Sequence, residues 1–419
     1  MMAESSNSLK IFHVEILLHI NSLLKRNDVV ARVATWLSTQ GVIGKESIIT
    51  KFDDDLLSEH INSIKIYEND YKNVNGEFPE VCYYVYSFNS TAPEIEESED
   101  EQQISTQWVL PTQEFYNLWD SLIYDNDVKG ELLNYVGTAL AFSDKSVDPT
   151  IVSWNRIVLL HGPPGTGKTS LCKALAQKIC IRFSSKFSYG QLIEVNTHSL
   201  FSKWFSESGK LVTKMFQSIL SLVEDPNVLV IVLLDEVETL ARSRSSALSG
   251  NEPSDALRVV NALLTHLDMI KRYPNVLILT TSNITDAIDV ALIDRADIKQ
   301  YIGLPSIEAI YQIYSTCIKE LQQCGIICTR ELLLPLHRLR ISAENEQCEP
   351  LLHEGRSLKL RAIAEQSMGL SGRTLRKMPF IACALFIKTK LVSLDVFLDA
   401  LSKAVEKHWQ DVKNLHAHT

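Results

Sequence analysis

A glycine-rich segment in the middle of the chain has the residue types that bind a phosphate chain. Its eight members are Gly162, Pro163, Pro164, Gly165, Thr166, Gly167, Lys168 and Thr169. Glycines let backbone N–H groups curl around phosphate oxygens, and a helix that starts there adds the positive end of its dipole. At this spacing Lys168 reaches the β- and γ-phosphates, and the hydroxyl of Thr169 can hold Mg²⁺. The segment predicts a P-loop that binds ATP with Mg²⁺, the alternative being a glycine turn that fits by chance.

Two acids supply what hydrolysis needs beyond phosphate binding. The apolar run 230–234 ends in Asp235 and Glu236. A buried strand that delivers two acids at its carboxyl end places them beside the P-loop. We expect Asp235 to hold Mg²⁺ through its water shell and Glu236 to polarise the attacking water as general base. The alternative is a pair of surface acids after a core strand.

A further polar residue follows the next apolar run. Residues 277–279 lead into Thr280, Thr281, Ser282 and Asn283. We expect Asn283 to orient the water between Glu236 and the γ-phosphate, although a residue of this type also suits a strand-end turn.

The segments that must position these groups alternate between apolar runs typical of strands and apolar residues at helical spacing. Apolar strands are expected at residues 156–160, 192–195, 228–234 and 276–281. Between them, Val212, Met215, Phe216, Ile219, Leu220 and Val223 recur at helical spacing. The fold class is therefore α/β, with a parallel sheet covered by helices on both faces.

The domain plan has four parts. Residues 1–90 predict a small α+β domain for recognition, with strands near residues 64–67 and 81–86 and a helix around residues 29–37. Six acids among residues 94–101 predict a solvated linker over residues 91–106, the alternative being a docking tail. Residues 107–303 are the large nucleotide-binding domain. Residues 304–419 have helical periodicity and form a small helical lid.

Composition narrows the classes of partner. The net charge is −10, which argues against broad contact with nucleic acid, since that needs a concentrated positive surface. The 8 cysteines show no zinc or disulfide spacing, and we expect free thiols in a reducing compartment. We expect no signal peptide and no membrane span. A cytosolic or nuclear protein is predicted.

Together these residues resemble the AAA+ ATPases over roughly residues 110–410. Residues 250–256, 258–265, 294–303 and 369–373 resemble the pachytene-checkpoint branch, also called thyroid-hormone-receptor interactors. The resemblance implies a homo-hexamer that uses ATP to remodel HORMA-domain proteins, often through a HORMA-type adaptor. It implies work in the spindle assembly checkpoint and on meiotic chromosomes, with a location in the nucleus, including chromosomes and kinetochores, and in the cytoplasm.

The resemblance also implies roles for single residues. Arg295 matches an arginine finger that reaches the neighbouring subunit's γ-phosphate, and it stands alone where many relatives have two arginines. Arg373 matches a sensor arginine of the lid. Trp204, supported by Phe205, matches a pore loop that grips an extended chain, and residues 243–251 match a second pore loop. Surface arginines and an aromatic pair packed under a loop are the alternatives.

Two other functions compete with the remodeller. One is a nucleotide-dependent assembly scaffold without mechanical output, which would need neither Glu236 nor Arg295. The other is a DNA-directed motor, which the acidic balance and the aromatic loop at Trp204 disfavour.

Overall fold

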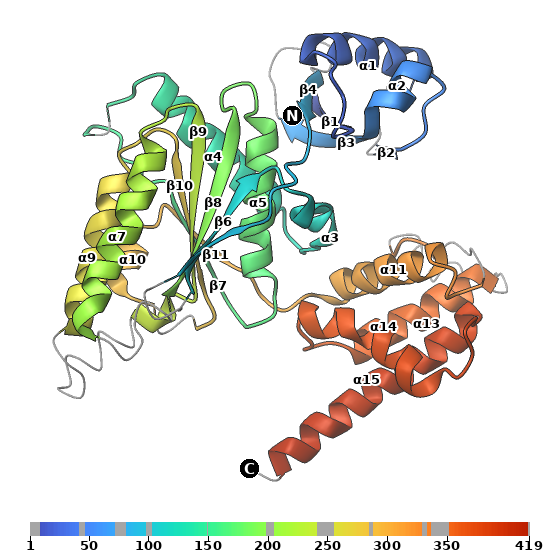
Figure 1. Cartoon of the computed structure of the whole chain (residues 1–419). Helices are drawn as coiled ribbons and strands as arrows, with labels where there is room; N and C mark the ends of the chain where they lie inside the picture. Colours follow the sequence, from blue (N-terminus) through green and yellow to red (C-terminus); the bar gives the residue numbers. More distant parts are fainter. Residues whose placement is uncertain are drawn as a thin grey trace, which may run out of the picture.

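The computed structural model has three parts, which Figure 1 shows as a central sheet with its helices, a small N-terminal domain and a helical C-terminal domain. The structure describes residues 9–41, 47–71, 81–97, 103–148, 150–197, 205–240, 255–284, 288–328, 333–336 and 352–417. Within these residues, no helix is long and apolar enough to span a bilayer.

The central domain is built on a seven-stranded sheet with the order β11-β7-β10-β9-β8-β6-β5. Five strands are parallel, as predicted: β7 (Ile157–His161), β8 (Tyr189–Asn196), β9 (Val228–Asp235), β10 (Val276–Ser282) and β11 (Ile298–Tyr301). Four of them correspond to predicted strands, whereas β11 was not predicted. All five end at one edge, where polar residues of successive strands meet.

Helices cover both faces of this sheet, which confirms the predicted α/β class. Alternate side chains of β9 enter opposite cores, since successive strand residues point to opposite faces. The first core contains α7 (Phe205–Val223), α9 (Asp255–Ile270) and α10 (Val290–Arg295), and the second contains α4 (Val128–Asp144) and α5 (Lys168–Arg182). In Figure 1, α7 and α9 flank one face of the sheet and α5 flanks the other. The predicted apolar stripe of α7 lies within or against the first core.

The acidic stretch is not a free linker over residues 91–106. It contains β5 (Glu94–Glu97), which pairs antiparallel with β6 (Gln103–Leu110), and β6 pairs antiparallel with β8. A charge run is compatible with this place because β5 is the outermost strand, where acidic side chains stay in water and discourage pairing with another chain. The backbone therefore follows the sheet, with Glu94 exposed and Glu96 half-buried beside Ser105, whose hydroxyl donates to it.

The N-terminal domain is a four-stranded sheet with two helices. Its strands lie in the order β2-β3-β1-β4. The elements are β1 (Leu9–Leu18), α1 (Arg26–Gln40), β2 (Ser47–Ile49), α2 (Asp55–His60), β3 (Ile61–Tyr71) and β4 (Val81–Tyr86). The strands and the helix expected here are confirmed, whereas β1 was not predicted because His13 and Glu15 interrupt its apolar pattern. Both residues lie on the side of β1 that meets the central domain.

Buried charges join the N-terminal domain to the helix that follows the P-loop. Glu15 of β1 and Lys178 of α5 are 2% and 3% exposed, and their charged atoms lie 2.7 Å apart. Arg182, the last residue of α5, approaches Glu15 at 3.4 Å, and Lys178 lies 3.5 Å from the ring centroid of Tyr67. A second pair joins Lys65 to Asp120 at 2.7 Å. The N-terminal domain is thus docked, in contrast to the mobile domain that a free linker would allow.

In the described part of the C-terminal domain, four helices pack around an apolar core. They are α11 (Ile307–Gln323), α13 (Leu352–Gln366), α14 (Gly372–Phe386) and α15 (Leu394–Ala417). Ser371 caps α14 by accepting a hydrogen bond from the backbone N–H of Thr374. This capped end of α14 faces the P-loop, which brings the lid to the edge of the nucleotide site.

Candidate functional site

The predicted P-loop connects β7 to α5, and two of its glycines have no room for a side chain. Gly162 has φ +140°, and a Cβ there would lie 2.2 Å from the carbonyl oxygen of Ile302. Gly165 has φ +76°, and its Cβ would lie 2.7 Å from Oγ of Ser371. Only glycine fits these left-handed, closely approached positions. Close packing against Ile302 and Ser371 therefore fixes the shape of the loop.

Lys168 is buried at the base of this loop. Its Nζ donates hydrogen bonds of 2.8 Å to the carbonyl oxygens of Gly162 and Pro163. Burial lowers the pKa of Lys168, while the carboxylates of Glu238, Asp235 and Glu236 act in the opposite direction. The ammonium is thus held within the loop by weak neutral acceptors, which a phosphate oxygen would replace with a charged one.

Asp235 and Thr169 provide the oxygens for a divalent cation. Oγ1 of Thr169 lies 2.8 Å from Oδ1 of Asp235, and Thr281 donates a hydrogen bond to the same carboxylate oxygen. Hydroxyl and carboxylate oxygens are ligands that Mg²⁺ accepts, together with waters and phosphates. The donor set therefore fits Mg²⁺, with Thr169 and Asp235 as the residues that would hold it.

Glu236 follows Asp235 in a left-handed conformation, with φ +58°. Such a backbone is uncommon outside glycine and concentrates at functional sites. The N–H of Glu236 donates to Oγ1 of Thr281 at 3.2 Å, and its Oε1 accepts from Nδ2 of Asn283 at 3.2 Å. The predicted base and the predicted water-orienting amide are therefore in direct contact.

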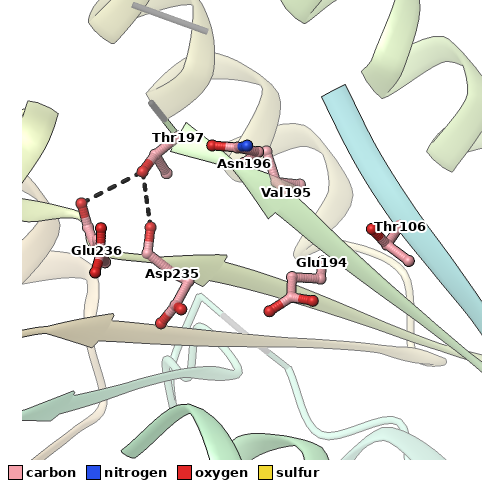
Figure 2. Close-up of a pocket in the computed structure, with 7 residues that line it drawn as sticks. All are labelled: Thr106, Glu194, Val195, Asn196, Thr197, Asp235 and Glu236. Atoms are coloured by element: carbon pink, nitrogen blue, oxygen red, sulfur yellow. Dashed lines mark hydrogen bonds between the residues drawn. The ribbon is translucent and has the colours of Figure 1, made fainter. Parts of the chain in front are cut away.

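The two acids open onto a cavity of about 220 Å³. Figure 2 shows that Asp235 and Glu236 lie side by side at the end of β9, with Glu194, Asn196 and Thr197 on the neighbouring segment. The hydroxyl of Thr197 donates to the carbonyl oxygen of Asp235 at 2.7 Å. This cavity gives water access to Glu236.

The lid contacts the P-loop through its backbone. The N–H of Arg373 donates to the carbonyl oxygen of Gly165 at 3.0 Å, and the side chain of Arg373 is exposed. Its positive charge adds to the lowering of the Lys168 pKa, after burial as the main cause. The backbone of Arg373 thus lies beside the P-loop, while its role as the sensor arginine that the resemblance implies stays a prediction.

A second cavity of about 230 Å³ lies between the large domain and the lid. Its walls include Tyr124, Asn126, Thr166, Tyr301 and Gly372. The sequence did not predict this cavity, because its lining residues come from five separate segments and form no motif. It lies beside Thr166 of the P-loop.

Arg295 lies at the end of α10, where it is paired with an acid of α9. Its Nη2 lies 2.8 Å from Oδ2 of Asp268, its Nε lies 3.1 Å from Oδ1, and Nη1 donates to the carbonyl oxygen of Ala291 at 2.9 Å. These bonds stay within α9 and α10, so in a single chain they do not bring Arg295 to the P-loop. The side chain is 28% exposed, which leaves it reachable from outside the chain.

The predicted pore loops cannot be placed. Trp204 and residues 243–251 lie outside the described residues. Phe205 begins α7, and its side chain is likewise outside what the structure describes.

Three polar residues of the site were missed: Thr197, Thr281 and Glu238. All are buried, and each bonds to Asp235, Glu236 or Asn283. Thr281 stands two residues before Asn283, in the polar end of β10 that begins at Thr280, which was an available signal. Glu238 follows Glu236 by two residues, and only the fold shows that it points back to β10.

Comparison with known proteins supports this organisation. The model of the AAA family of ATPases associated with various cellular activities matches residues 158–304, the TRIP13-like AAA+ lid C-terminal domain matches residues 306–409, and the TRIP13 N-terminal domain matches residues 7–91. Pachytene checkpoint protein 2 homologs of mouse and human are each 50% identical to the chain, over 97% of it and 95% of their own length.

Solved structures agree with the family models. The structure of C. elegans PCH-2 is 35% identical, covers 96% of this chain and 100% of its own, and has a TM-score of 0.77. An E. coli HORMA:CdnC:Trip13 complex contains a chain of the same fold, with 16% identity, a TM-score of 0.54 and coverage of 71% of this chain and 94% of its own. The chain therefore belongs to the TRIP13/pachytene checkpoint protein 2 family of AAA+ ATPases and is a nucleotide-binding ATP hydrolase.

Proposed function

We propose that the chain acts as a homo-hexamer that couples ATP hydrolysis to partial unfolding of HORMA-domain proteins, with a HORMA-type adaptor. The E. coli relative of the same fold was solved in complex with a HORMA protein, which supports this class of partner. The relatives' name, pachytene checkpoint protein 2, supports roles in checkpoint and meiotic chromosome control. These roles would place the protein in the nucleus, at chromosomes and kinetochores, and in the cytoplasm.

The observation that carries the proposal is the contact between Glu236 and Asn283 beside the Thr169–Asp235 pair. A base held by an amide, next to oxygens that fit Mg²⁺, is the arrangement that water attack on a γ-phosphate requires. An assembly scaffold needs to bind a nucleotide but does not need this arrangement. The site therefore favours turnover over static assembly.

Each residue has a defined part in this proposal. Lys168 binds the phosphates, Thr169 and Asp235 hold Mg²⁺, which neutralises phosphate charge when bound, and Glu236 takes the proton of the attacking water. Arg295, on the surface at the end of α10, acts on the nucleotide of the neighbouring subunit.

Residues of the lid and of the pore loop complete the proposed function. Arg373 senses the phosphates from the lid, because its backbone is bonded to Gly165 of the P-loop. Trp204, with Phe205, grips the substrate in the pore. Opening part of a small domain is energetically feasible, since whole domains are stable by only about 5–15 kcal/mol and local opening costs less.

Conversion of a HORMA-domain protein between its two conformers tests this function. The wild-type chain should convert the purified protein, plus adaptor, in the presence of ATP. Glu236→Gln should bind ATP and retain the substrate complex without converting it. Conversion by Glu236→Gln at the wild-type rate, or no conversion by a wild-type chain that hydrolyses ATP and binds the complex, would overturn the proposal and favour the scaffold.

A further inference from the structure

A third acid lies inside the hydrolysis site. Glu238 is 6% exposed, and its Oε1 and Oε2 each lie 3.2 Å from the backbone nitrogen of Asn283 and accept its N–H. A buried carboxylate is costly unless it is bonded or paired. Glu238 is therefore bonded, through the backbone of Asn283, to the end of β10.

The segment that carries Glu238 is fastened to the end of β10 at three successive residues. The N–H of Glu236 donates to Oγ1 of Thr281, the N–H of Val237 donates to the carbonyl oxygen of Thr281 at 2.9 Å, and Glu238 accepts from Asn283. The first two bonds are made to Thr281, which already lies within the sheet as part of β10. The third holds Asn283, which follows the last residue of β10 and lies beyond its ladder with β7 and β9.

We propose that Glu238 is a positioning residue of the hydrolysis site: it fixes the backbone of Asn283 so that the side-chain amide of Asn283 reaches Glu236. The chain of contacts runs from the Glu238 carboxylate to the Asn283 N–H, and from Asn283 Nδ2 to Glu236 Oε1 at 3.2 Å. This inference rests on the proposed roles of Glu236 and Asn283 and adds a residue that holds their geometry.

Variants of Glu238 separate the position of the acceptor from its charge. Glu238→Gln keeps an oxygen at the same distance from the backbone, whereas Glu238→Asp keeps the charge but withdraws it by one methylene. We expect Glu238→Asp and Glu238→Ala to lower kcat by about 10- to 100-fold, the size of effect expected from misplacing a catalytic group by about 1 Å. Glu238→Gln should stay within about 5-fold of the wild type, because a neutral acceptor gives a weaker bond than a charged one.

Nucleotide binding and ATP turnover must be measured separately, because a merely structural role of Glu238 would change both. Steady-state ATPase gives kcat and KM, titration with a fluorescent ADP gives nucleotide affinity, and thermal denaturation reports folding. We expect the affinity for ADP to stay within about 3-fold in all three variants, as befits residues that act on the transition state. If Glu238→Ala does not fold, Glu238→Asp against Glu238→Gln still decides the question.

A double-mutant cycle with Asn283→Ala supplies the decisive comparison. If Glu238 acts through Asn283, then adding Glu238→Asp to Asn283→Ala should change kcat by less than about 2-fold. A wild-type kcat for Glu238→Asp, or losses that multiply in the double variant, would overturn the positioning role. A wild-type kcat for Asn283→Ala alone would instead refute the proposed function of Asn283, so the two failures are distinguishable.

Discussion

Replacing Lys178 by methionine should loosen the N-terminal domain from the P-loop helix. Methionine keeps an unbranched apolar side chain but removes the ammonium, which neutralises Glu15 and lies over the ring of Tyr67. Glu15 would then remain almost fully buried, with Arg182 as its remaining cation at 3.4 Å. An unneutralised buried carboxylate is the origin of the expected effect.

Removing one partner of a buried ion pair costs about 3–5 kcal/mol. Because Arg182 stays close to Glu15, we expect the lower end of this range, about 3 kcal/mol, which corresponds to roughly 10²-fold in an opening equilibrium. Adding Glu15→Gln removes the unpaired charge and should restore at least about 1 kcal/mol of the loss.

Hydrogen exchange of the β1 amides, followed by mass spectrometry at constant pH, measures this opening. β1 pairs with both β3 and β4, so its amides exchange when the N-terminal domain unfolds locally. Unfolding of this domain also separates Glu15 from Lys178. A single melting temperature would not serve, since a chain of several domains need not unfold in one step.

Lys186→Met is the matched control, because Lys186 pairs with Asp144 in an exposed position, where ion pairs contribute at most about 1 kcal/mol. We expect exchange about 10²-fold faster in Lys178→Met and almost unchanged in Lys186→Met. Equal protection of β1 in the two variants would refute the inference that the buried pair holds the domains together.

Three further predictions concern pH, the subunit boundary and the substrate. Burial, reinforced by Arg182 and Lys178, lowers the pKa of His13 from 6.5 to about 3, so the unfolded chain binds a proton that the folded one does not. The contribution of His13 to stability should be complete above pH 6.5 and be lost as the pH drops toward 3; protection of the β1 amides from hydrogen exchange, corrected for the intrinsic pH dependence, should therefore fall less in His13→Gln than in the wild type, and an equal fall in both would contradict the prediction. Arg295→Ala and Glu236→Gln should each be inactive, and mixing them should restore part of the ATPase if the finger acts in trans, whereas no recovery in mixed assemblies would argue against it. Trp204→Ala should keep its ATPase and lose conversion of the HORMA-domain protein, and conversion at the wild-type rate would remove Trp204 from the gripping role.

The sequence predicts the nucleotide-binding half of the site well because its chemistry is local. The P-loop needs its glycines, lysine and threonine in one short segment. Asp235 and Glu236 follow seven apolar residues, 228–234, which predict a buried strand and are all buried in the structure. The parallel sheet then brings the strand ends together, so Asn283 meets Glu236 as a consequence of topology.

The remaining features depend on contacts between distant segments. The glutamates of β5 led to the prediction of a linker because an edge strand and a solvated loop both tolerate charge. In the sequence, Glu15 only interrupts an apolar stretch, because its partner, Lys178, is 163 residues away. Glu238 carries no motif, and its role follows from a turn at Glu236 with a positive φ, which the residue type does not predict.

The most direct test of the account is the ATPase rate with and without a purified HORMA-domain protein and its adaptor, with the mass of the assembly measured by light scattering. The account predicts faster turnover with the partner, in an assembly six times the 47.3 kDa of one chain. Turnover that ignores the partner, in particles of single-chain mass, would contradict it.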